Sequence, residues 1–291
     1  MDPAGELARR LSGARDPQLV GAILASVRHL HALVREVRPD SEGLRRALEF
    51  LTEVGQASDA RRQEWVLLAD VLGISTLVED LAHEGTPGAT PQTVAGPFYR
   101  ADVPDTPDGA DICLDGRGER LAVTGRVRGT DGSAVGGARV EVWQANGEGL
   151  YENQEPDLQP EFNLRGRFRT DGKGTFRFFS VRPKGFGLPS DGPVGQLLGA
   201  LGCRLERPAH LHFRVTAPGF RTLVTHVFDR ADPAVGRDAL FGVKPELLGD
   251  FRPAGDGQWW LDVALVLVSD GGRTETTPRA GRAAPGTRGR D

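Results

Sequence analysis

Apolar residues recur at helical spacing through the first part of the chain. One stripe consists of Leu19, Ile23, Val27, Leu30, Val34 and Val37, and a second consists of Leu44, Leu48, Leu51 and Val54. Residues three or four apart lie on one face of a helix, so each stripe predicts an amphipathic helix. The apolar faces are expected to pack against a core or against other helices.

Polar residues and prolines mark where these helices begin and end. Asp16-Pro17 offers a side-chain acceptor at the N-cap and a proline at the first helical position, and Pro39-Asp40-Ser41 separates the two stripes. A third helical stretch is predicted from about Ser58 to Ala82. Gly73 and the β-branched residues after it have low helix propensity, so we expect a break there.

The pattern changes after residue 85. Residues 85–97 are rich in glycine, threonine and proline, which is typical of a linker. Short runs of β-branched and aromatic residues follow, separated by turns such as 129–132. The predicted strands are 121–127, 138–144, 175–181, 210–217, 222–228 and 259–268.

These elements predict a mainly β protein with a helical N-terminal part, of the α+β class. No helices long enough for repeated crossovers lie between the strands, which favours an antiparallel β-sandwich. The predicted domains are a helical domain over 1–90 and a β-sandwich over 91–270. Residues 271–291 are rich in arginine, glycine and proline and predict a disordered tail.

Composition narrows the class of partner. The chain has 291 residues and a formal net charge of −4, which gives no general attraction for nucleic acid or an anionic membrane. The sequence offers no apolar run of membrane-spanning length, and Met1–Glu6 lacks the pattern of a secretory signal, so we expect a cytoplasmic protein. Its two cysteines, Cys113 and Cys203, are expected to be reduced. A small-molecule partner is expected.

His210 and His212 form the strongest chemical pattern. Side chains two apart on a strand share a face, so both imidazoles can converge on one metal while Leu211 points away. Neutral imidazole suits iron, copper, nickel or zinc, whereas an exposed or hydrogen-bonded pair is the alternative interpretation. The remaining helical histidines are assigned structural roles: His29, His31 and His83.

Several motifs in order along the chain resemble the intradiol ring-cleavage dioxygenases, most closely those acting on hydroxyquinol and next those acting on catechol. The resemblance spans residues 16–268. The motifs are 28–32 (RHLHA), 93–99 (TVAGPFY), 142–146 (VWQAN), 149–151 (GLY), 162–167 (FNLRGR), 191–196 (DGPVGQ), 207–213 (RPAHLHF) and 239–244 (ALFGVK).

The resemblance implies a β-sandwich holding a non-haem Fe(3+) ion, preceded by helices that form a homodimer and hold a bound lipid. The metal ligands it implies are Tyr151, His210 and His212. The second tyrosine ligand of the family falls at Phe186, which has no oxygen. Tyr99, the only other tyrosine, lies in the linker motif, where the resemblance implies a pocket position.

Other site residues come from the same resemblance. Arg207 matches an arginine beside the substrate, where a fixed cation stabilises developing negative charge, and His226 matches a pocket glutamine or histidine. Packing is the alternative role for the apolar members of the pocket, and solvated charge for Asp80. The implied substrate-binding positions are Leu77, Asp80, Val94, Gly96, Pro97, Phe186, Leu188, Pro189 and Leu240.

The resemblance therefore predicts an oxidoreductase that uses O2 to open a catechol or hydroxyquinol between its two hydroxylated carbons. The product is an open-chain dicarboxylic acid of the muconate or maleylacetate type. Phe186 leaves two alternatives. One is a non-catalytic relative that binds aromatic diols, and the other is an enzyme with a changed metal or reaction, since one tyrosine and two histidines also suit Fe(II) or Zn(II).

Overall fold

The computed structural model of the chain describes residues 3–59, 62–83 and 86–271. They divide into two compact units, residues 1–62 and 63–291. The predicted C-terminal tail lies, except for residue 271, outside the described residues. No helix in the described ranges is both long and apolar enough to cross a bilayer.

The first unit is helical. It contains α1 (Pro3–Arg10), α2 (Pro17–Val37) and α3 (Ser41–Gln56). The predicted caps are confirmed, because Asp16 Oδ1 accepts from the Leu19 N–H at 2.9 Å and Asp40 Oδ1 accepts from the Gly43 N–H at 2.7 Å. The hydrophobic stripes did not predict α1.

The second unit begins with two short helices, α4 (Glu64–Val71) and α5 (Ile74–Ala82). Gly73 separates them with a left-handed φ of 71°, which confirms the predicted break. A third helix, α6 (Pro193–Ala200), lies in a long excursion between strands and was not predicted. The Val194 N–H donates to the buried carboxylate of Glu64 at 3.1 Å, which joins α6 to α4.

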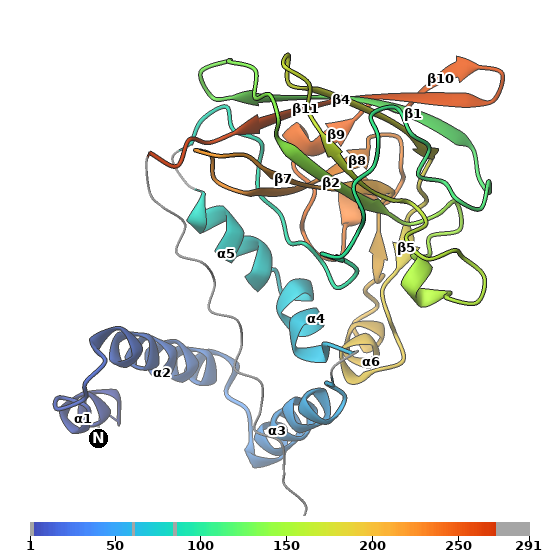
Figure 1. The fold of residues 1–291 in the computed structure, drawn as a ribbon. Helices are drawn as coiled ribbons and strands as arrows, with labels where there is room; N and C mark the ends of the chain where they lie inside the picture. Colours follow the sequence, from blue (N-terminus) through green and yellow to red (C-terminus); the bar gives the residue numbers. More distant parts are fainter. Residues whose placement is uncertain (1–2, 60–61, 84–85, 272–291) are drawn as a thin grey trace, which may run out of the picture. The chain divides into compact units, whose positions relative to one another are not determined.

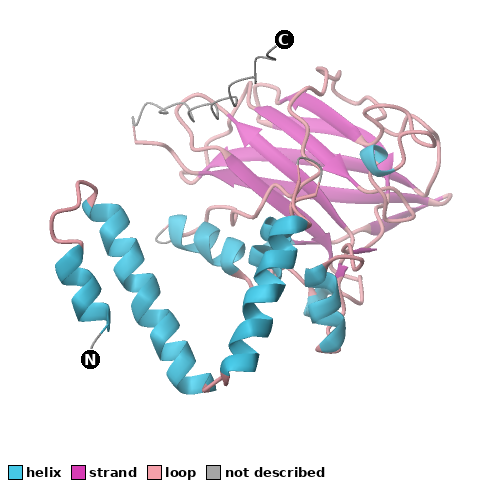
Figure 2. Ribbon diagram, turned by 90° about the horizontal axis from the view of Figure 1, so that it is seen from below, coloured by secondary structure: helices cyan, strands magenta, loops and turns pink. Residues whose placement is uncertain are grey.

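Two sheets form the layers of the second unit (Figure 1; Figure 2). One has the order β10 (Arg252–Gly255), β11 (Gln258–Leu267), β1 (Arg120–Gly129) and β4 (Thr175–Val181). The other has the order β3 (Arg165–Arg169), β2 (Arg139–Gln144), β7 (His210–Thr216), β8 (Leu223–Asp229) and β9 (Leu248–Gly249). A two-stranded ribbon joins β5 (Phe186–Gly187) to β6 (Glu206–Arg207), and three 3-10 turns lie at Glu152–Gln154, Val235–Arg237 and Pro245–Leu247.

The predicted sandwich and its six strands are confirmed, with one correction to the strand directions. Most pairs are antiparallel, but β1 pairs in parallel with β11, and β8 pairs in parallel with β9. The first pairing joins strands that lie more than 130 residues apart in the chain, and no local turn signals it. Both sheets are therefore mixed.

The core lies between the sheets and decides which face of β7 is available for chemistry. Leu211, Phe213 and Val215 of β7 pack into the core with β1, β4 and β11 residues, including Val123 and Phe176. Side chains alternate along a strand, so His210 and His212 lie on the opposite face, away from this core. That face is nonetheless covered, since both histidines are buried.

Candidate metal centre

Three neighbouring strands present aromatic and imidazole rings in one row. Trp143 on β2 lies opposite His212 on β7, and His212 lies opposite His226 on β8. The Trp143 and His212 rings stack with centroids 4.6 Å apart, and the His212 and His226 ring centroids are 4.2 Å apart. With His210, the two histidines form a buried cluster whose ligand atoms lie within 4.8 Å of one another.

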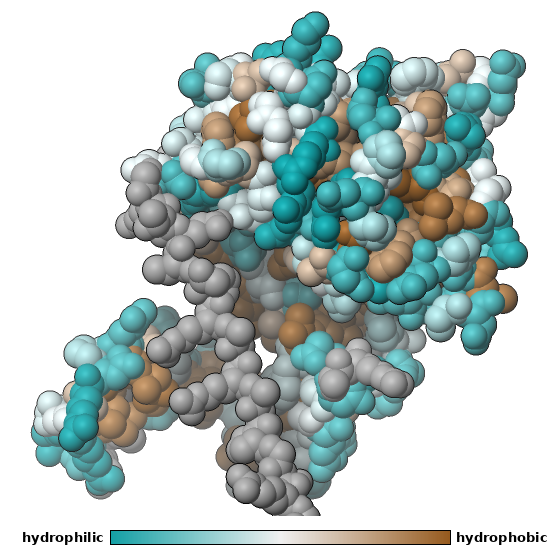
Figure 3. Space-filling model, in the orientation of Figure 1, coloured by the Kyte–Doolittle hydropathy of each residue, from teal (hydrophilic) through white to brown (hydrophobic). Residues whose placement is uncertain are grey.

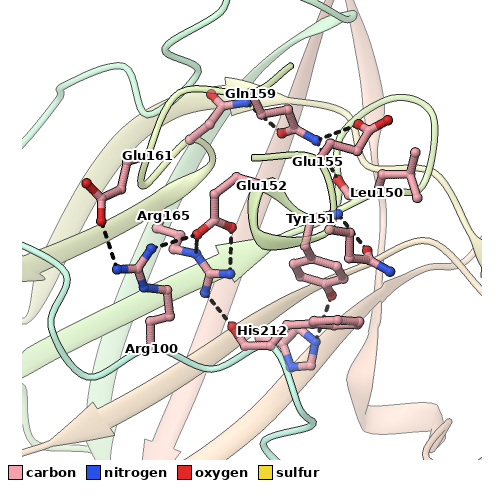
Figure 4. A network of polar contacts seen from close by, with 12 residues as sticks. Arg100, Leu150, Tyr151, Glu152, Glu155, Gln159, Glu161, Arg165 and His212 are labelled. Atoms are coloured by element: carbon pink, nitrogen blue, oxygen red, sulfur yellow. Dashed lines mark hydrogen bonds and ion pairs between the residues drawn. The ribbon is translucent and has the colours of Figure 1, made fainter. Parts of the chain in front are cut away.

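Tyr151 completes the cluster from the segment that follows β2. Asn146 shapes this segment, because its Oδ1 accepts from the N–H groups of Glu148 and Leu150 at 2.9 and 3.0 Å. The Tyr151 side chain is buried, and its hydroxyl lies 3.0 Å from His212 Nε2, as Figure 4 shows. His210 Nε2 lies 3.1 Å from His212 Nε2.

These three atoms fit a metal ion. The His210 Nδ1 nitrogen lies 2.7 Å from the Pro208 carbonyl, to which it donates, so His210 Nε2 carries a lone pair aimed at His212. Burial and the Arg207 cation lower the pKa of His210 to about 3, and burial lowers the pKa of His212 well below its ordinary value. Both imidazoles are thus neutral at pH 7, the form that binds metals.

The phenol of Tyr151 is protonated until a cation displaces its proton. Burial raises the pKa of Tyr151 well above its ordinary value, while the Arg207 and Arg165 guanidinium groups oppose that rise. A bound metal cation lowers the pKa of a coordinating group strongly enough to deprotonate it. The set of one phenol and two imidazoles therefore suits iron, and it has room for exchangeable ligands.

Phe186 faces the same space but contributes no donor atom. Its ring lies 5.7 Å from the centroids of both Tyr151 and His210. Gly149 permits this approach, since it has a left-handed φ of 88° and a Cβ there would meet Gly185 O at 2.9 Å. The Phe186 ring thus lies next to the Tyr151 and His210 rings and adds only carbon atoms to this space.

Arg207 is held beside the histidines by a buried carboxylate. Its Nε donates to Asp238 Oδ1 at 3.1 Å, and its Nη1 lies 3.5 Å from His226 Nε2. Arginine has no acceptor atom, so His226 Nε2 accepts and its proton lies on Nδ1. Burial lowers the pKa of His226 well below its ordinary value, and Arg207 acts in the same direction.

Besides Phe186, two of the predicted pocket residues lie against this cluster or its support. Gly96 lies next to His212, since a Cβ at Gly96 would be in van der Waals contact with the imidazole Cε1 at 3.7 Å. Leu240 is buried in the turn that Asp238 organises, because Asp238 Oδ2 accepts from the Gly242 N–H at 2.9 Å. Thr76 Oγ1 donates to the Leu240 carbonyl at 2.8 Å and ties α5 to this turn.

Asp80 lies elsewhere on the same unit. It pairs with Lys244 and lines a cavity of about 290 Å³ together with His83 and Arg221. No contact of Asp80 with the histidine cluster is seen, so its role as a substrate contact stays a prediction. The same holds for the other pocket positions, which lie on α5, in the linker and after β5: Leu77, Val94, Pro97, Leu188 and Pro189.

The structure also brings in residues that the sequence analysis did not single out for the site. Phe98 stacks on Tyr151 with ring centroids 4.3 Å apart. The carboxylate of Glu152, the residue after Tyr151, is buried against Arg165, as Figure 4 shows. Asp238 supports Arg207 from 31 residues away. The TVAGPFY and FNLRGR motifs contain Phe98 and Arg165, and the GLY motif ends directly before Glu152, but none of these motifs indicated a role for the three residues.

Two family models match the chain over nearly the same span as these features. The model described as catechol dioxygenase N terminus matches residues 16–90, and the model described as dioxygenase matches residues 94–270. Together they leave only the two ends and a three-residue gap unmatched.

Individual relatives agree with the family models. The hydroxyquinol 1,2-dioxygenase of Rhizobium sp. (strain MTP-10005) is 51% identical over 249 residues, which cover 86% of this chain and 84% of that protein. The 6-chlorohydroxyquinol 1,2-dioxygenase of Cupriavidus pinatubonensis is 43% identical, covering 87% and 91%. The solved structure of hydroxyquinol 1,2-dioxygenase from Pseudomonas putida DLL-E4 superposes with a TM-score of 0.86 at 36% identity, covering 92% and 97%. The chain belongs to the intradiol ring-cleavage dioxygenase family.

Proposed function

We propose that this protein is an iron-dependent dioxygenase that opens the ring of a hydroxyquinol or catechol between its two hydroxylated carbons. Both atoms of O2 enter the product, an open-chain dicarboxylic acid of the maleylacetate or muconate type. The observation that carries the proposal is the convergence of Tyr151 Oη, His210 Nε2 and His212 Nε2 within 3.0–3.1 Å steps. The identity to relatives named hydroxyquinol 1,2-dioxygenase and 6-chlorohydroxyquinol 1,2-dioxygenase supports the substrate class.

The metal ligands in this proposal are Tyr151, His210 and His212. A ferric ion held there would supply Lewis-acid activation of an ortho-diol and the electron transfer that makes its ring reactive toward O2. The neutral imidazoles and the single phenolate give a metal site with less negative charge than one with two phenolates. A diol that has lost both of its protons would suit such a site, because its two negative charges would offset the charge of the ferric ion.

Proton removal from the diol falls to groups other than Phe186. His226 is proposed to accept a proton, because its Nε2 is an acceptor and its ring touches both ligand histidines. Arg207 is proposed to stabilise negative charge that develops on the ring oxygens, since its cation is fixed by Asp238. The residues proposed to line the pocket around the substrate's aromatic ring are Leu240, Gly96, Val94, Pro97, Leu77, Asp80, Phe186, Leu188 and Pro189.

The proposed assembly is a homodimer formed through the N-terminal helices, with a lipid held between them. The support is an uncovered apolar stripe in the first unit, visible as brown surface over its helices in Figure 3. Its exposed members include Leu19, Ile23, Leu30, Val34, Val37, Leu44 and Leu48.

The proposed domain division is a helical domain over 1–90 and a β-sandwich over 91–270. The proposed compartment is the cytoplasm, which suits Cys113 and Cys203, since neither forms a disulfide.

The test is oxygen uptake by the iron-loaded protein with hydroxyquinol, catechol and a chlorocatechol, together with identification of the ring-opened product. Uptake with one mole of O2 per mole of diol is expected, with hydroxyquinol as the best substrate. The proposal fails if the iron-loaded protein binds these diols and consumes no O2 with any of them. That result would support the non-catalytic alternative.

The third histidine favours one second candidate. His226 lies within 4.8 Å of the ligand atoms of His210 and His212, and three imidazoles suit Zn(II) or Fe(II). A changed metal or reaction is then the alternative. A colourless protein after ferric loading, with tight binding of a divalent ion, would favour it.

A further inference from the structure

Arg165 is a buried guanidinium beside Tyr151, and each of its three nitrogens donates a hydrogen bond. Its side chain is 1% exposed and that of Glu152 is 3% exposed. Its Nε and Nη2 donate to the two oxygens of Glu152 at 2.7 and 2.6 Å, and its Nη1 donates to the Phe98 carbonyl at 2.5 Å. A planar fork with this many fixed donors is a property of arginine that lysine lacks.

The two partners of Arg165 come from the two segments that hold the Tyr151 ring. Glu152 directly follows Tyr151 in the chain, and Phe98 stacks on the Tyr151 ring at 4.3 Å and 23°. One guanidinium thus fastens both segments, and Figure 4 shows it beside Glu152 and close to Tyr151. Arg100 adds a longer contact to Glu152, at 3.3 Å.

The backbone of Arg165 is also in register with the metal cluster. Arg165 on β3 lies opposite Trp143 on β2, which lies opposite His212 on β7. The arginine therefore ties the Tyr151 segment to the strand row that carries the histidines. Tyr151 follows β2 in a loop, and a loop side chain needs such support to hold its hydroxyl 3.0 Å from His212 Nε2.

We infer that Arg165, locked by Glu152, is the positioning residue that places the Tyr151 phenol at the metal. The inference rests on the proposed role of Tyr151 as the iron ligand. It gives the pair a function specific to this site: with phenylalanine at 186, the geometry of one phenolate decides both the colour and the retention of the ion. Outer-shell partners of metal ligands typically change metal affinity by about 10–100-fold.

The experiment compares Arg165→Lys and Glu152→Gln with the unaltered protein after ferric loading. The readouts are the visible absorption band from tyrosinate to iron and the rate at which a chelator removes the iron. We expect both variants to weaken and shift the band, and Arg165→Lys to release iron about 10–100-fold faster. Arg177→Lys is the matched control, because Arg177 makes a similar paired contact with Asp108 at the exposed edge of β4.

Thermal unfolding of each variant separates positioning from folding. The inference is overturned if the variants fold and keep the band position and the release rate of the unaltered protein. It is also overturned if Arg165→Lys fails to fold while Glu152→Gln folds with an unchanged band, since the pair would then serve stability alone. If the unaltered protein shows no band at all, the iron role of Tyr151 under the proposed function fails first.

Discussion

The two walls of the metal cluster are built differently. The Tyr151 wall, made of Tyr151, Phe98, Glu152 and Arg165, places a phenol oxygen at the histidines and fixes it with a buried ion pair. The Phe186 wall, made of Phe186, Arg207 and Asp238, has an equally buried ion pair but an aromatic ring without oxygen. Both walls contain a buried arginine–carboxylate pair, and they differ in that the Tyr151 ring carries a hydroxyl and the Phe186 ring does not.

This difference predicts which functions survive. Under the proposed function, the Tyr151 wall supplies a metal ligand, whereas the Phe186 wall supplies the Arg207 guanidinium and an aromatic surface. Phe186 pairs with Arg207 through the β5–β6 ribbon, so the ring and the cation are placed by the same local structure. In the proposed metal site, phenylalanine at position 186 would leave a coordination position for an exogenous ligand.

The largest expected effect on the visible band and on activity comes from replacing Tyr151 by phenylalanine, so that neither wall has a phenol. Tyr151→Phe removes the last phenol of the cluster, so the tyrosinate band should vanish and activity should fall below about 1% of the unaltered level, because even outer-shell changes cost about 10–100-fold in metal affinity or activity. Visible spectra and oxygen uptake measure both. Tyr99→Phe is the control, since the Tyr99 hydroxyl contacts Glu141 at 3.4 Å instead of the histidines. A band that survives in Tyr151→Phe and disappears in Tyr99→Phe would reverse the assignment.

The opposite change places a tyrosine in the Phe186 wall, so that both walls carry a phenol. Phe186→Tyr adds a hydroxyl to a ring already facing the cluster, which supplies a second phenolate and a proton acceptor. We expect a stronger, shifted visible band and a rise in kcat of about 100-fold, the lower range for a positioned acid–base group. Phe179→Tyr, on the outer sheet at β4, is the matched control. An unchanged spectrum would show that residue 186 does not reach the metal.

The three buried histidines, His210, His212 and His226, should make the metal-free protein less stable at acidic pH. Burial depresses the pKa of all three histidines, to about 3 for His210. Between about pH 6.5 and 3 the unfolded chain binds a proton that native His210 excludes, so stability falls as the pH falls, by about 2 kcal/mol for His210 at pH 5. His212 and His226 act in the same direction. Urea unfolding at pH 7.5 and 5.0 measures this loss.

His226→Gln provides the comparison for that measurement, because it removes one of the three depressed groups and keeps a polar side chain. The loss of stability between the two pH values should therefore be smaller in this variant than in the unaltered protein. Equal losses in the two proteins would mean that His226 is protonated in the native state.

The smallest expected effect on stability and on the visible band comes from replacing Phe98, which stacks on Tyr151. Phe98 stacks on Tyr151 at 4.3 Å but meets Phe186 only edge-on at 6.5 Å. Phe98→Leu should therefore cost about 1 kcal/mol of stability, typical of a lost aromatic pair, and shift the tyrosinate band slightly. Phe186→Leu should leave the band position nearly unchanged. If the two variants shift the band equally, the walls are not independent.

Local patterns determined much of this protein. Alternation around Leu211 predicted that His210 and His212 share a face, and the structure confirms it because the sandwich core takes the other face. The caps at Asp16 and Asp40 and the break at Gly73 followed from local backbone chemistry. The helix α6 escaped prediction because Gly195 and Gly199 weaken an already short segment.

The supports of the site were beyond local reasoning. Arg165, Glu152 and Asp238 look like ordinary surface charges in the sequence, and only the fold buries them. Asp238 binds Arg207, which lies 31 residues away in the chain. The parallel pairing of β1 with β11 joins the strands that come first and last in the sequence. Side-chain periodicity has no information about such distant partners.

The sequence by itself therefore determined the family, the strand that carries the histidines, and the presence of phenylalanine at position 186. Tertiary structure decided that Tyr151 Oη and two imidazole nitrogens converge, that His226 joins them, and that each wall rests on a buried arginine–carboxylate pair. The physical reason is that residue types and spacings specify local conformation, whereas convergence and burial depend on how the sheets and loops pack over long separations in the chain.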